Sequence, residues 1–217
     1  ENLQNLGVET ILVEMADQVI TPIDYEMATE IHKHLLSKGV KLCLGEQVVS
    51  FDNDQNKVVV KLKRGNSIST DMVIMSIGVK PDTKLAKNAD LKIGETGAIY
   101  VDEFMQTSDE NIYALGDAVE SWHPNLDLKR FIPLAGPANK QARIVANNIV
   151  FGNHEKYAGT LGTAIVKVFD LSVGFTGLSE KFLQQKNIKC HSTIIHSSSH
   201  ASYYPNATSL SIKGIFA

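Results

Sequence analysis

The sequence predicts an α/β fold that continues into a smaller α+β region, and three observations support this prediction. Apolar strand-like segments at residues 10–14 and 40–44 flank a segment with helical periodicity at residues 21–39, the pattern of a βαβ unit with parallel strands. A second helix is predicted at residues 137–152. From Gly162 onward, strand-like segments surround one short helix, which is typical of α+β structure.

The first helix is predicted from its ends and its apolar spacing. Thr21 can cap the amino-terminal end, Pro22 suits the first helical position, and Gly39 suits the residue after the last turn. Four apolar residues recur at helical spacing between these ends: Ile23, Met27, Ile31 and Leu35. We therefore expect a helix that starts at Pro22 and ends before Gly39.

The second helix follows a segment that is poor in polar side chains and bounded by Pro133 and Pro137. Pro137 suits its first turn, and Gly152 suits its end. Its predicted apolar stripe is Ile144, Val145 and Ile149. Bare backbone N–H groups at such a start carry a partial positive charge that attracts an anion, for example the N1 and O2 region of a reduced flavin. The same segment also fits an ordinary helix that packs on a sheet.

The other elements are predicted from turn residues and alternating patterns. Ser179 can cap a short helix that runs to Lys186. The predicted β segments are a hairpin of Val48–Ser50 and Lys57–Lys63 around residues 53–56, the apolar strand Met72–Ile77, irregular structure at residues 83–102 with turns at Gly94 and Gly97, and strands at Ala164–Leu171, Ile188–Ile195 and Ser209–Phe216.

Both ends of the sequence are predicted to lie within structural elements. Residues 1–6 have the pattern of the last turns of a helix, with Gly7 after them, and Ser209–Phe216 has the pattern of a strand. We therefore expect the chain to be a piece of a longer protein.

Composition limits the classes of function. The 217 residues carry a formal net charge of −3 and contain no basic stretch, so no nucleic-acid partner is predicted. No apolar run is long enough to span a membrane, and the first residues do not predict a signal peptide. The two cysteines, Cys43 and Cys190, fit neither a metal spacing nor a redox pair, which favours a reducing, cytoplasmic compartment.

The stretch from Thr107 to Asp117 is the first candidate site. Its apolar run, Ile112–Leu115, is predicted to be a strand, and Gly116 and Asp117 follow its carboxyl end, where ligands bind in open α/β sheets. Gly116 allows close approach of the backbone to a ligand, and the Asp117 carboxylate can accept hydrogen bonds from sugar-type hydroxyls. An ordinary strand followed by a Gly-Asp turn also fits the pattern.

Glu14 is the second candidate, because it ends a strand as the acid of a βαβ nucleotide site does, at the carboxyl end of the second strand. A carboxylate at this place in a nucleotide-binding, Rossmann-like unit accepts hydrogen bonds from both adenine-ribose hydroxyls and repels a 2′-phosphate, which favours NADH over NADPH. A surface carboxylate without a ligand also fits, because no Gly-rich turn precedes Glu14 in this chain.

The carboxyl-terminal region contains three histidines and a Tyr-Tyr-Pro sequence. The histidines, His191, His196 and His200, have no helical pairing and no nearby acid, so no metal site is predicted. Tyr203 and Tyr204 are expected to present their phenols on opposite faces of an extended segment, so that one packs and the other offers its hydroxyl to a ligand or intermediate.

Taken in order, these segments resemble the FAD-dependent pyridine nucleotide-disulfide oxidoreductases, and within them the coenzyme A-disulfide reductase and NADH oxidase/peroxidase branch. The resemblance covers essentially the whole chain. The matching segments are Val13-Glu14, Ile77 through Pro81, Thr107 through Ala118, Pro133 through Gln141, Gly162 through Ala164, Lys167 through Phe169, and His200 through Pro205.

The resemblance implies a domain division and a role for each candidate. Residues 1–80 would be the carboxyl-terminal part of an NAD(P)H-binding domain, residues 81–152 that of an FAD-binding domain, and residues 153–217 the start of a dimerisation domain in a homodimer. For FAD, the resemblance implies ribitol binding by Asp117, a pyrophosphate or ribitol contact at Ala118, and positions near the flavin ring for Leu134, Ala135 and Ala138.

For the other sites, the resemblance implies that Glu14 binds the adenine ribose of NAD(P)H and that Gly78 lies between the two cofactors. It also implies that Tyr203 or Tyr204 assists the thiol chemistry.

The sequence departs from the family in small and large ways. Ala142 and Asn206 stand where relatives often have glycine, and both replacements are conformationally mild. The Gly-rich loops and the redox cysteine of the family belong upstream of Glu1. Cys43, inside an apolar strand, is interpreted as a small buried hydrophobe rather than as the nucleophile.

The resemblance implies a disulfide reductase as the intact protein, which would pass electrons from NAD(P)H through FAD to a cysteine centre that reduces a low-molecular-weight disulfide such as CoA disulfide or a persulfide. This chain alone is expected to be inactive. One alternative is an NADH oxidase or peroxidase. Another is a non-catalytic dimerising piece that binds no cofactor.

Overall fold

The computed structural model describes residues 1–124, 126 and 128–216 of the chain. These residues form two compact units. The first unit combines residues 1–75 with the chain from Ile165 onward, and the second unit comprises Ser76–Ala164. The division into three domains stays a prediction. No helix in the described part of the chain is long and apolar enough to cross a membrane.

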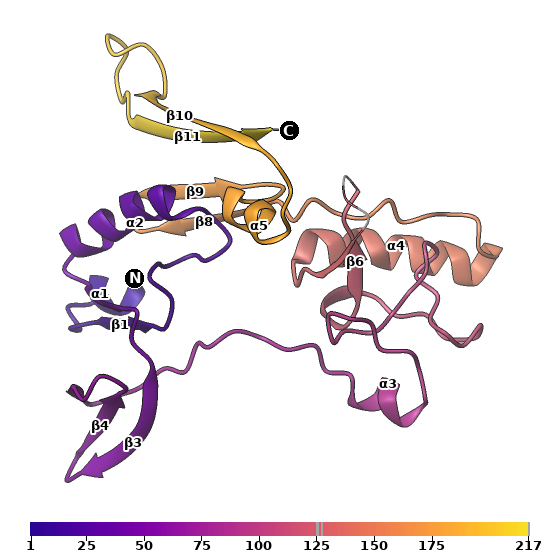
Figure 1. Cartoon of the computed structure of the whole chain (residues 1–217), viewed down its shortest axis with the longest axis horizontal. Helices are drawn as coiled ribbons and strands as arrows, with labels where there is room; N and C mark the ends of the chain where they lie inside the picture. The colour runs from indigo at the N-terminus through magenta and orange to yellow at the C-terminus, as the bar shows by residue number, and fades with distance from the viewer. Residues whose placement is uncertain (125, 127, 217) are drawn as a thin grey trace. The chain divides into compact units, whose positions relative to one another are not determined.

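The first unit contains the predicted βαβ unit. Strand β1 (Ile11–Glu14) pairs in parallel with β2 (Lys41–Leu44), and helix α2 (Tyr25–Ser37) connects them. Helix α2 lies between this pair and the hairpin of β8 (Ala164–Val168) and β9 (Leu171–Phe175), and side chains from all of these elements form one core (Figure 1). The parallel strands and the connecting helix confirm the predicted α/β pattern.

The start of α2 differs from the prediction. The helix begins at Tyr25 with Asp24 as its N-cap residue, not at Pro22 with Thr21 as the cap. The amide of Ile23 donates to the carbonyl oxygen of Ile20 at 3.1 Å, so Pro22 lies in a tight turn before the helix. The predicted end is confirmed, because Gly39 follows the C-cap residue with a φ of +84°.

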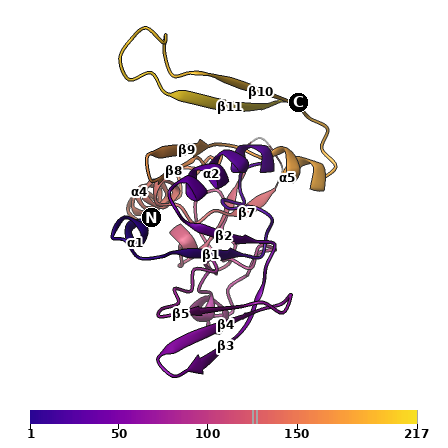
Figure 2. The ribbon, with the colours of Figure 1, turned by 90° about the vertical axis from the view of Figure 1, so that its left-hand side faces the viewer.

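The remaining helices and strands of the first unit include the predicted hairpin and a third strand that sequence patterns missed. Figure 2 shows the three antiparallel strands β3, β4 and β5 as a separate sheet below the β1–β2 pair. Their bounds, and those of the short helices and the last hairpin, are α1 (Asn2–Asn5), β3 (Val48–Asp54), β4 (Lys57–Leu62), β5 (Ser67–Thr70), α5 (Glu180–Gln185), β10 (His191–Ser198) and β11 (Ser209–Phe216).

Two predicted strands of the first unit have different bounds. The segment Ala164–Leu171 is not one strand, because Phe169, with a φ of +54°, reverses the chain between β8 and β9. Strand β10 begins at His191 and runs to Ser198, three residues beyond the predicted end. It pairs antiparallel with β11 along its whole length. This hairpin lies in the region that was predicted to be α+β structure.

The predicted strand Met72–Ile77 is wrong. This segment forms no strand in the described residues, and Ile77 is 87% exposed. Apolar composition favours a strand only where a neighbouring strand offers hydrogen-bond partners, and the described residues offer none here.

The second unit packs helix α4 (Ala135–Phe151) against irregular structure and short strands. Met105, Val119 and Ile144 are among the buried residues of its core. Irregular structure with a turn between Gly94 and Gly97 is found as predicted, but a helix at its start was missed. The other elements are α3 (Lys84–Asn88), the 3₁₀ helix η1 (Gly116–Ala118), β6 (Glu120–Trp122) and β7 (Lys129–Phe131).

Candidate functional site

The Gly-Asp pair lies in a tight turn rather than after a strand. The predicted strand Ile112–Leu115 is wrong, because only Tyr113 forms an isolated bridge, with Gln106. Gly116, with a φ of +74°, opens the 3₁₀ helix η1, which is a backbone conformation that favours glycine. The Asp117 carboxylate in this turn is exposed to solvent.

Helix α4 holds this turn through Gln141. The Oε1 atom of Gln141 accepts a hydrogen bond from the Gly116 N–H at 2.8 Å, and its Nε2 atom donates to Ser121 Oγ at 3.1 Å. Gln141 is only 1% exposed. A Cβ atom on Gly116 would lie 3.7 Å from the Cβ atom of Ala138, so the turn and the first turns of α4 are in close contact. The structure therefore brings together Gly116, Asp117, Ala118 and Ala138.

The amino-terminal end of α4 is suited to an anion. Its N-cap residue, Leu134, supplies no side-chain hydrogen bond, and the first turn contains no acidic residue. Ala135 and Gly136 therefore present backbone N–H groups without a side-chain cap, where the helix dipole favours negative charge. Next to it, Asp117 supplies an exposed hydrogen-bond acceptor. A group that combines hydroxyls with an anionic ring edge, as FAD does, fits this set of donors and acceptors.

Two further side chains with polar groups, Tyr157 and His123, are buried in the second unit. Burial raises the pKa of the Tyr157 phenol, although contacts with Gln141, Ser121 and Thr160 oppose this rise. The ring of His123 is buried, and burial together with the nearby Arg130 guanidinium lowers its pKa. His123 is therefore neutral at pH 7, and neither of its buried ring nitrogens has a hydrogen-bond partner among the described residues.

The apolar stripe predicted for α4 is partly wrong. Ile144 and Val145 are buried as predicted, but Ile149 is 62% exposed. The core-facing side also carries Gln141 and Asn148, each 1% exposed. Asn148 satisfies backbone groups, since its Nδ2 atom donates to the carbonyl oxygens of Phe104 and Glu155 at 3.1 and 2.8 Å. One sequence feature indicates that Gln141 is buried: it precedes Ile144 by three residues and Val145 by four, so it lies on the same face of the helix as these buried residues.

Glu14 lies in the first unit, at the end of β1. Its Oε1 atom accepts a hydrogen bond from the Ala16 N–H at 2.8 Å, which fixes the carboxylate at the carboxyl end of a parallel strand. Ligands of open α/β sheets bind beyond the carboxyl ends of the strands, where this carboxylate lies. Gly78, in the second unit, has a φ of +93°, and a Cβ atom added to it would meet no neighbouring atom of the described chain within 4 Å, so its surroundings are open.

The two tyrosines do not lie on opposite faces of an extended segment. The Tyr204 N–H donates to the carbonyl oxygen of Ala201 at 3.0 Å, so the chain turns here, and the two rings lie in contact, tilted by 36° with centroids 5.0 Å apart. Both rings are exposed, Tyr203 at 83%. His200 joins the same loop, since its Nε2 atom lies 3.2 Å from the carbonyl oxygen of Pro205. We call residues 199–208, between β10 and β11, the tyrosine loop.

The remaining candidates are placed as follows. Cys43 lies half-buried within β2 and is a free thiol, as is Cys190 just before β10. His196 Nδ1 lies 2.9 Å from Ser211 Oγ across the last hairpin. Among the described residues, the group of metal-type ligands that lies close together is Asp24, Glu26 and Glu180, and the ammonium group of Lys213 contacts all three carboxylates.

Comparisons with known proteins identify the family of the chain. The family profile described as pyridine nucleotide-disulphide oxidoreductase matches residues 1–142. The chain is 34% identical over 209 residues to the NAD(P)H sulfur oxidoreductase (CoA-dependent) of Pyrococcus furiosus, covering 96% of the chain and 47% of that protein. It is 36% identical over 211 residues to the NADH oxidase of Methanocaldococcus jannaschii, covering 97% of the chain and 46% of that protein.

A solved structure shares the fold over the whole chain. The crystal structure of reduced CoADR-RHD from Bacillus anthracis superposes with a TM-score of 0.95 and 47% sequence identity, covering 100% of this chain and 39% of that one. The chain thus spans about half the length of the curated relatives that it matches. Since the family profile covers most of the sequence, the chain belongs to the pyridine nucleotide-disulphide oxidoreductase family.

Proposed function

We propose that the chain forms part of the FAD and NAD(P)H sites of a flavoprotein that reduces a low-molecular-weight disulfide such as CoA disulfide, or a persulfide. Bound FAD supplies a two-electron relay between NAD(P)H and a cysteine centre. The observation that carries the proposal is the contact between the Gly116–Ala118 turn and the uncapped start of α4, held by Gln141. The CoA-dependent sulfur oxidoreductase named among the relatives supports this class of substrate.

Each residue of the proposed FAD site has a physical role. Asp117 would accept hydrogen bonds from the ribitol hydroxyls, and the backbone of Gly116 and Ala118 would approach the ligand closely. The N–H groups of Ala135 and Gly136 would stabilise negative charge on the ring, since they lie at an uncapped helix start. Leu134, Ala135 and Ala138 would supply the apolar contacts beside it.

The other proposed sites lie apart from the FAD site in sequence. Glu14 would hold the adenine ribose of the nicotinamide cofactor, with NADH favoured, and Gly78 would lie between the two cofactors. Tyr203 and Tyr204 would assist the thiol chemistry of the disulfide substrate. Neither Cys43 nor Cys190 is proposed as the redox nucleophile. We further propose a homodimer whose interface includes residues from the 153–217 region.

Replacing Asp117 with alanine should weaken FAD retention. The lost hydrogen bonds involve a charged acceptor, and each is worth about 1.5–3 kcal/mol, so we expect at least a roughly tenfold weaker affinity. The flavin-to-protein absorbance ratio after purification measures the effect. Glu110→Ala is the matched control, because Glu110 is another exposed acid in the same approach segment. Equal flavin content in wild type and Asp117→Ala would remove Asp117 from the site.

Replacing Glu14 with alanine should reduce the preference for NADH over NADPH. Wild type gains hydrogen bonds to the ribose hydroxyls and repels a 2′-phosphate, and the variant loses both effects. We expect kcat/KM with NADH to fall by about tenfold or more, while the value with NADPH stays unchanged or rises. Each cofactor acts as the control for the other. A parallel fall with both cofactors would contradict a ribose contact.

An NADH oxidase is a second candidate, since the relative from Methanocaldococcus jannaschii carries that name at 36% identity. Oxygen consumption and disulfide reduction measured on the same enzyme, with NADH as the donor, separate the two activities. Disulfide turnover that exceeds oxygen consumption supports the reductase, and the reverse supports the oxidase.

A further inference from the structure

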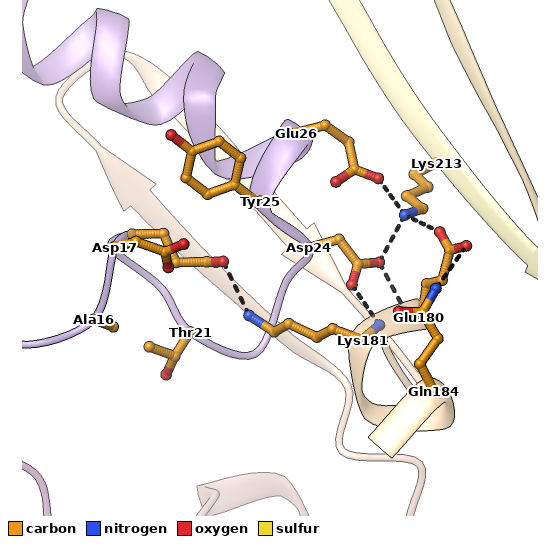
Figure 3. Close-up of a pocket in the computed structure, with 11 residues that line it drawn as sticks. Ala16, Asp17, Thr21, Asp24, Tyr25, Glu26, Glu180, Lys181, Gln184 and Lys213 are labelled. Carbon is orange, nitrogen blue, oxygen red and sulfur yellow. Dashed lines mark hydrogen bonds and ion pairs between the residues drawn. The ribbon is translucent and has the colours of Figure 1, made fainter. Parts of the chain in front are cut away.

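The first unit contains a buried cation that is surrounded by three carboxylates and that the proposed reaction does not use. The Nζ atom of Lys213 on β11 lies 3.0 Å from Asp24 Oδ2 and 2.6 Å from Glu180 Oε2, and it also contacts the Glu26 carboxylate (Figure 3). The side chains of Lys213 and Asp24 are 5% and 6% exposed. We call these four residues the Lys213 cluster.

The cluster joins segments that are far apart in the sequence. Asp24 and Glu26 lie at the start of α2, Glu180 lies in the first turn of α5, and Lys213 lies on β11. Asp24 also accepts hydrogen bonds from the backbone N–H groups of Glu180 and Lys181, both at 3.0 Å. Figure 3 shows the carboxylates converging from α2 and α5 on the ammonium group of Lys213.

The charges of the cluster depend on one another. Burial opposes the charge on Lys213, but hydrogen bonds with Glu180, Glu26 and Asp24 outweigh it and raise the pKa of Lys213 above its usual value. Burial also opposes the charge on Asp24, yet its contacts with Lys181, Lys213 and Glu180 lower its pKa. Removing the ammonium group would leave three carboxylates within 4.8 Å of one another without their shared counter-ion.

A second polar contact between the β10–β11 hairpin and α5 is the hydrogen bond between the Ser192 hydroxyl on β10 and the Glu180 carboxylate. All eight residues of β10 are exposed. A cavity of about 390 Å³ lies beside β11 and is lined by residues of α2, β9 and β11, including Met27, Val173 and Ile212. Apolar packing is incomplete where that cavity lies, so the three ion pairs of Lys213 contribute strongly to the attachment of the hairpin.

The hairpin carries the tyrosine loop, because residues 199–208 connect β10 to β11. Strand pairing transmits the position of β11 to the loop: Ser198 pairs with Ser209, and the Ser199 N–H donates to the carbonyl oxygen of Thr208 at 2.8 Å. A contact that fixes Lys213 therefore also fixes the base from which Tyr203 and Tyr204 project.

We propose that Lys213 is a positioning residue that docks the β10–β11 hairpin on α2 and α5 and thereby sets the position of Tyr203 and Tyr204 for disulfide chemistry. The effect on chemistry rests on the proposed function, whereas the docking of the hairpin does not. Lys213 acts through the hairpin and does not touch the substrate.

The test compares Lys213→Met, Lys213→Arg and Lys189→Met in the flavin-loaded enzyme. Lys189 is the matched control, since it is an exposed lysine just before β10. Hydrogen exchange measures docking: in Lys213→Met we expect amides of β10, β11 and the tyrosine loop to exchange at least about tenfold faster, with β1 and β2 unchanged. Lys213→Arg should restore much of the protection, and Lys189→Met should match wild type.

Two kinetic readouts separate positioning from general destabilisation. Turnover of a low-molecular-weight disulfide should fall about tenfold in Lys213→Met, while the rate of flavin reduction by NADH stays within about twofold of wild type. If Lys213→Met does not fold, Glu26→Gln removes a single, half-exposed contact and should show the same pattern at smaller amplitude.

The outcomes distinguish the two claims. Faster exchange of the hairpin in an enzyme without any disulfide activity supports docking and overturns the proposed function. Normal hairpin exchange in Lys213→Met overturns docking, whatever the activity of the enzyme. Equal loss of flavin reduction and of disulfide turnover overturns the positioning role, because it indicates a general loss of structure.

Discussion

Replacing Gly159 with alanine is expected to destabilise the second unit by about 3 kcal/mol or more, since overpacking and a disfavoured backbone conformation act together. Gly159 has a φ of +84°, and a Cβ atom there would lie 2.2 Å from the carbonyl oxygen of Trp122. The same oxygen accepts a hydrogen bond from the Thr160 N–H at 2.9 Å. Relief of the clash must therefore move the backbone of β6 or break this hydrogen bond.

The effect should extend to the proposed FAD site. Trp122 directly follows Ser121, whose hydroxyl accepts the hydrogen bond from Gln141. Trp122 is the single tryptophan of the chain, so its fluorescence during thermal unfolding reports on β6 directly. We expect the midpoint of Gly159→Ala to fall by about 6 °C or more.

Gly97→Ala provides the matched control for Gly159→Ala. Gly97 lies in the same unit with a φ of +83°, but no atom lies within 4 Å of its Cβ position. Its replacement should lower the free energy of unfolding by only roughly 1–2 kcal/mol, the cost of placing alanine in a left-handed backbone conformation. Equal midpoints for the two variants would show that the contact between residue 159 and Trp122 is not tight.

Replacing Gln141 with leucine is expected to destabilise the second unit by about 2–6 kcal/mol and to reduce FAD retention at the same time. The two side chains are similar in size, so the main change is the loss of two hydrogen bonds. The Gly116 N–H and Ser121 Oγ lose their partner in a buried environment, at a cost of about 1–3 kcal/mol each. The turn that carries Asp117 is then no longer tied to α4.

Thermal unfolding and the flavin-to-protein ratio measure these two effects of Gln141→Leu. Lys140→Leu is the matched control, because Lys140 precedes Gln141 in α4 and is exposed. It should leave both quantities close to their wild-type values. A stable Gln141→Leu variant with full flavin content would refute the role of Gln141 as the link between α4 and the Gly116–Ala118 turn.

Local signals in the sequence predicted much of the fold. The apolar spacing of Ile31 and Leu35 predicted α2, and glycines with positive φ ended both long helices, at Gly39 and Gly152. The parallel pairing of β1 with β2 followed from the order strand, helix, strand. These features depend on contacts between near neighbours in the chain, so a single sequence contains the information for them.

Features that depend on distant partners were not predicted. The segments Ile112–Leu115 and Met72–Ile77 have strand composition but no ladder of partners in the described residues, so composition alone gave the wrong result. The hydrogen bond from Gly116 to Gln141 spans 25 residues, and the contact between Lys213 and Glu26 spans 187. Neither pairing produces a pattern in the neighbouring sequence. The position of Gln141 on the apolar face of α4 does indicate a buried polar side chain, but it does not identify the partner.

The most direct test of the central claim is hydrogen exchange of the backbone amides with and without FAD. We predict that FAD slows exchange of the Gly116, Asp117, Ala135 and Gly136 amides, while β3 and β4 in the first unit exchange at the same rate in both states. Bound FAD that leaves these four amides unprotected, or that protects other segments instead, would contradict the proposed site.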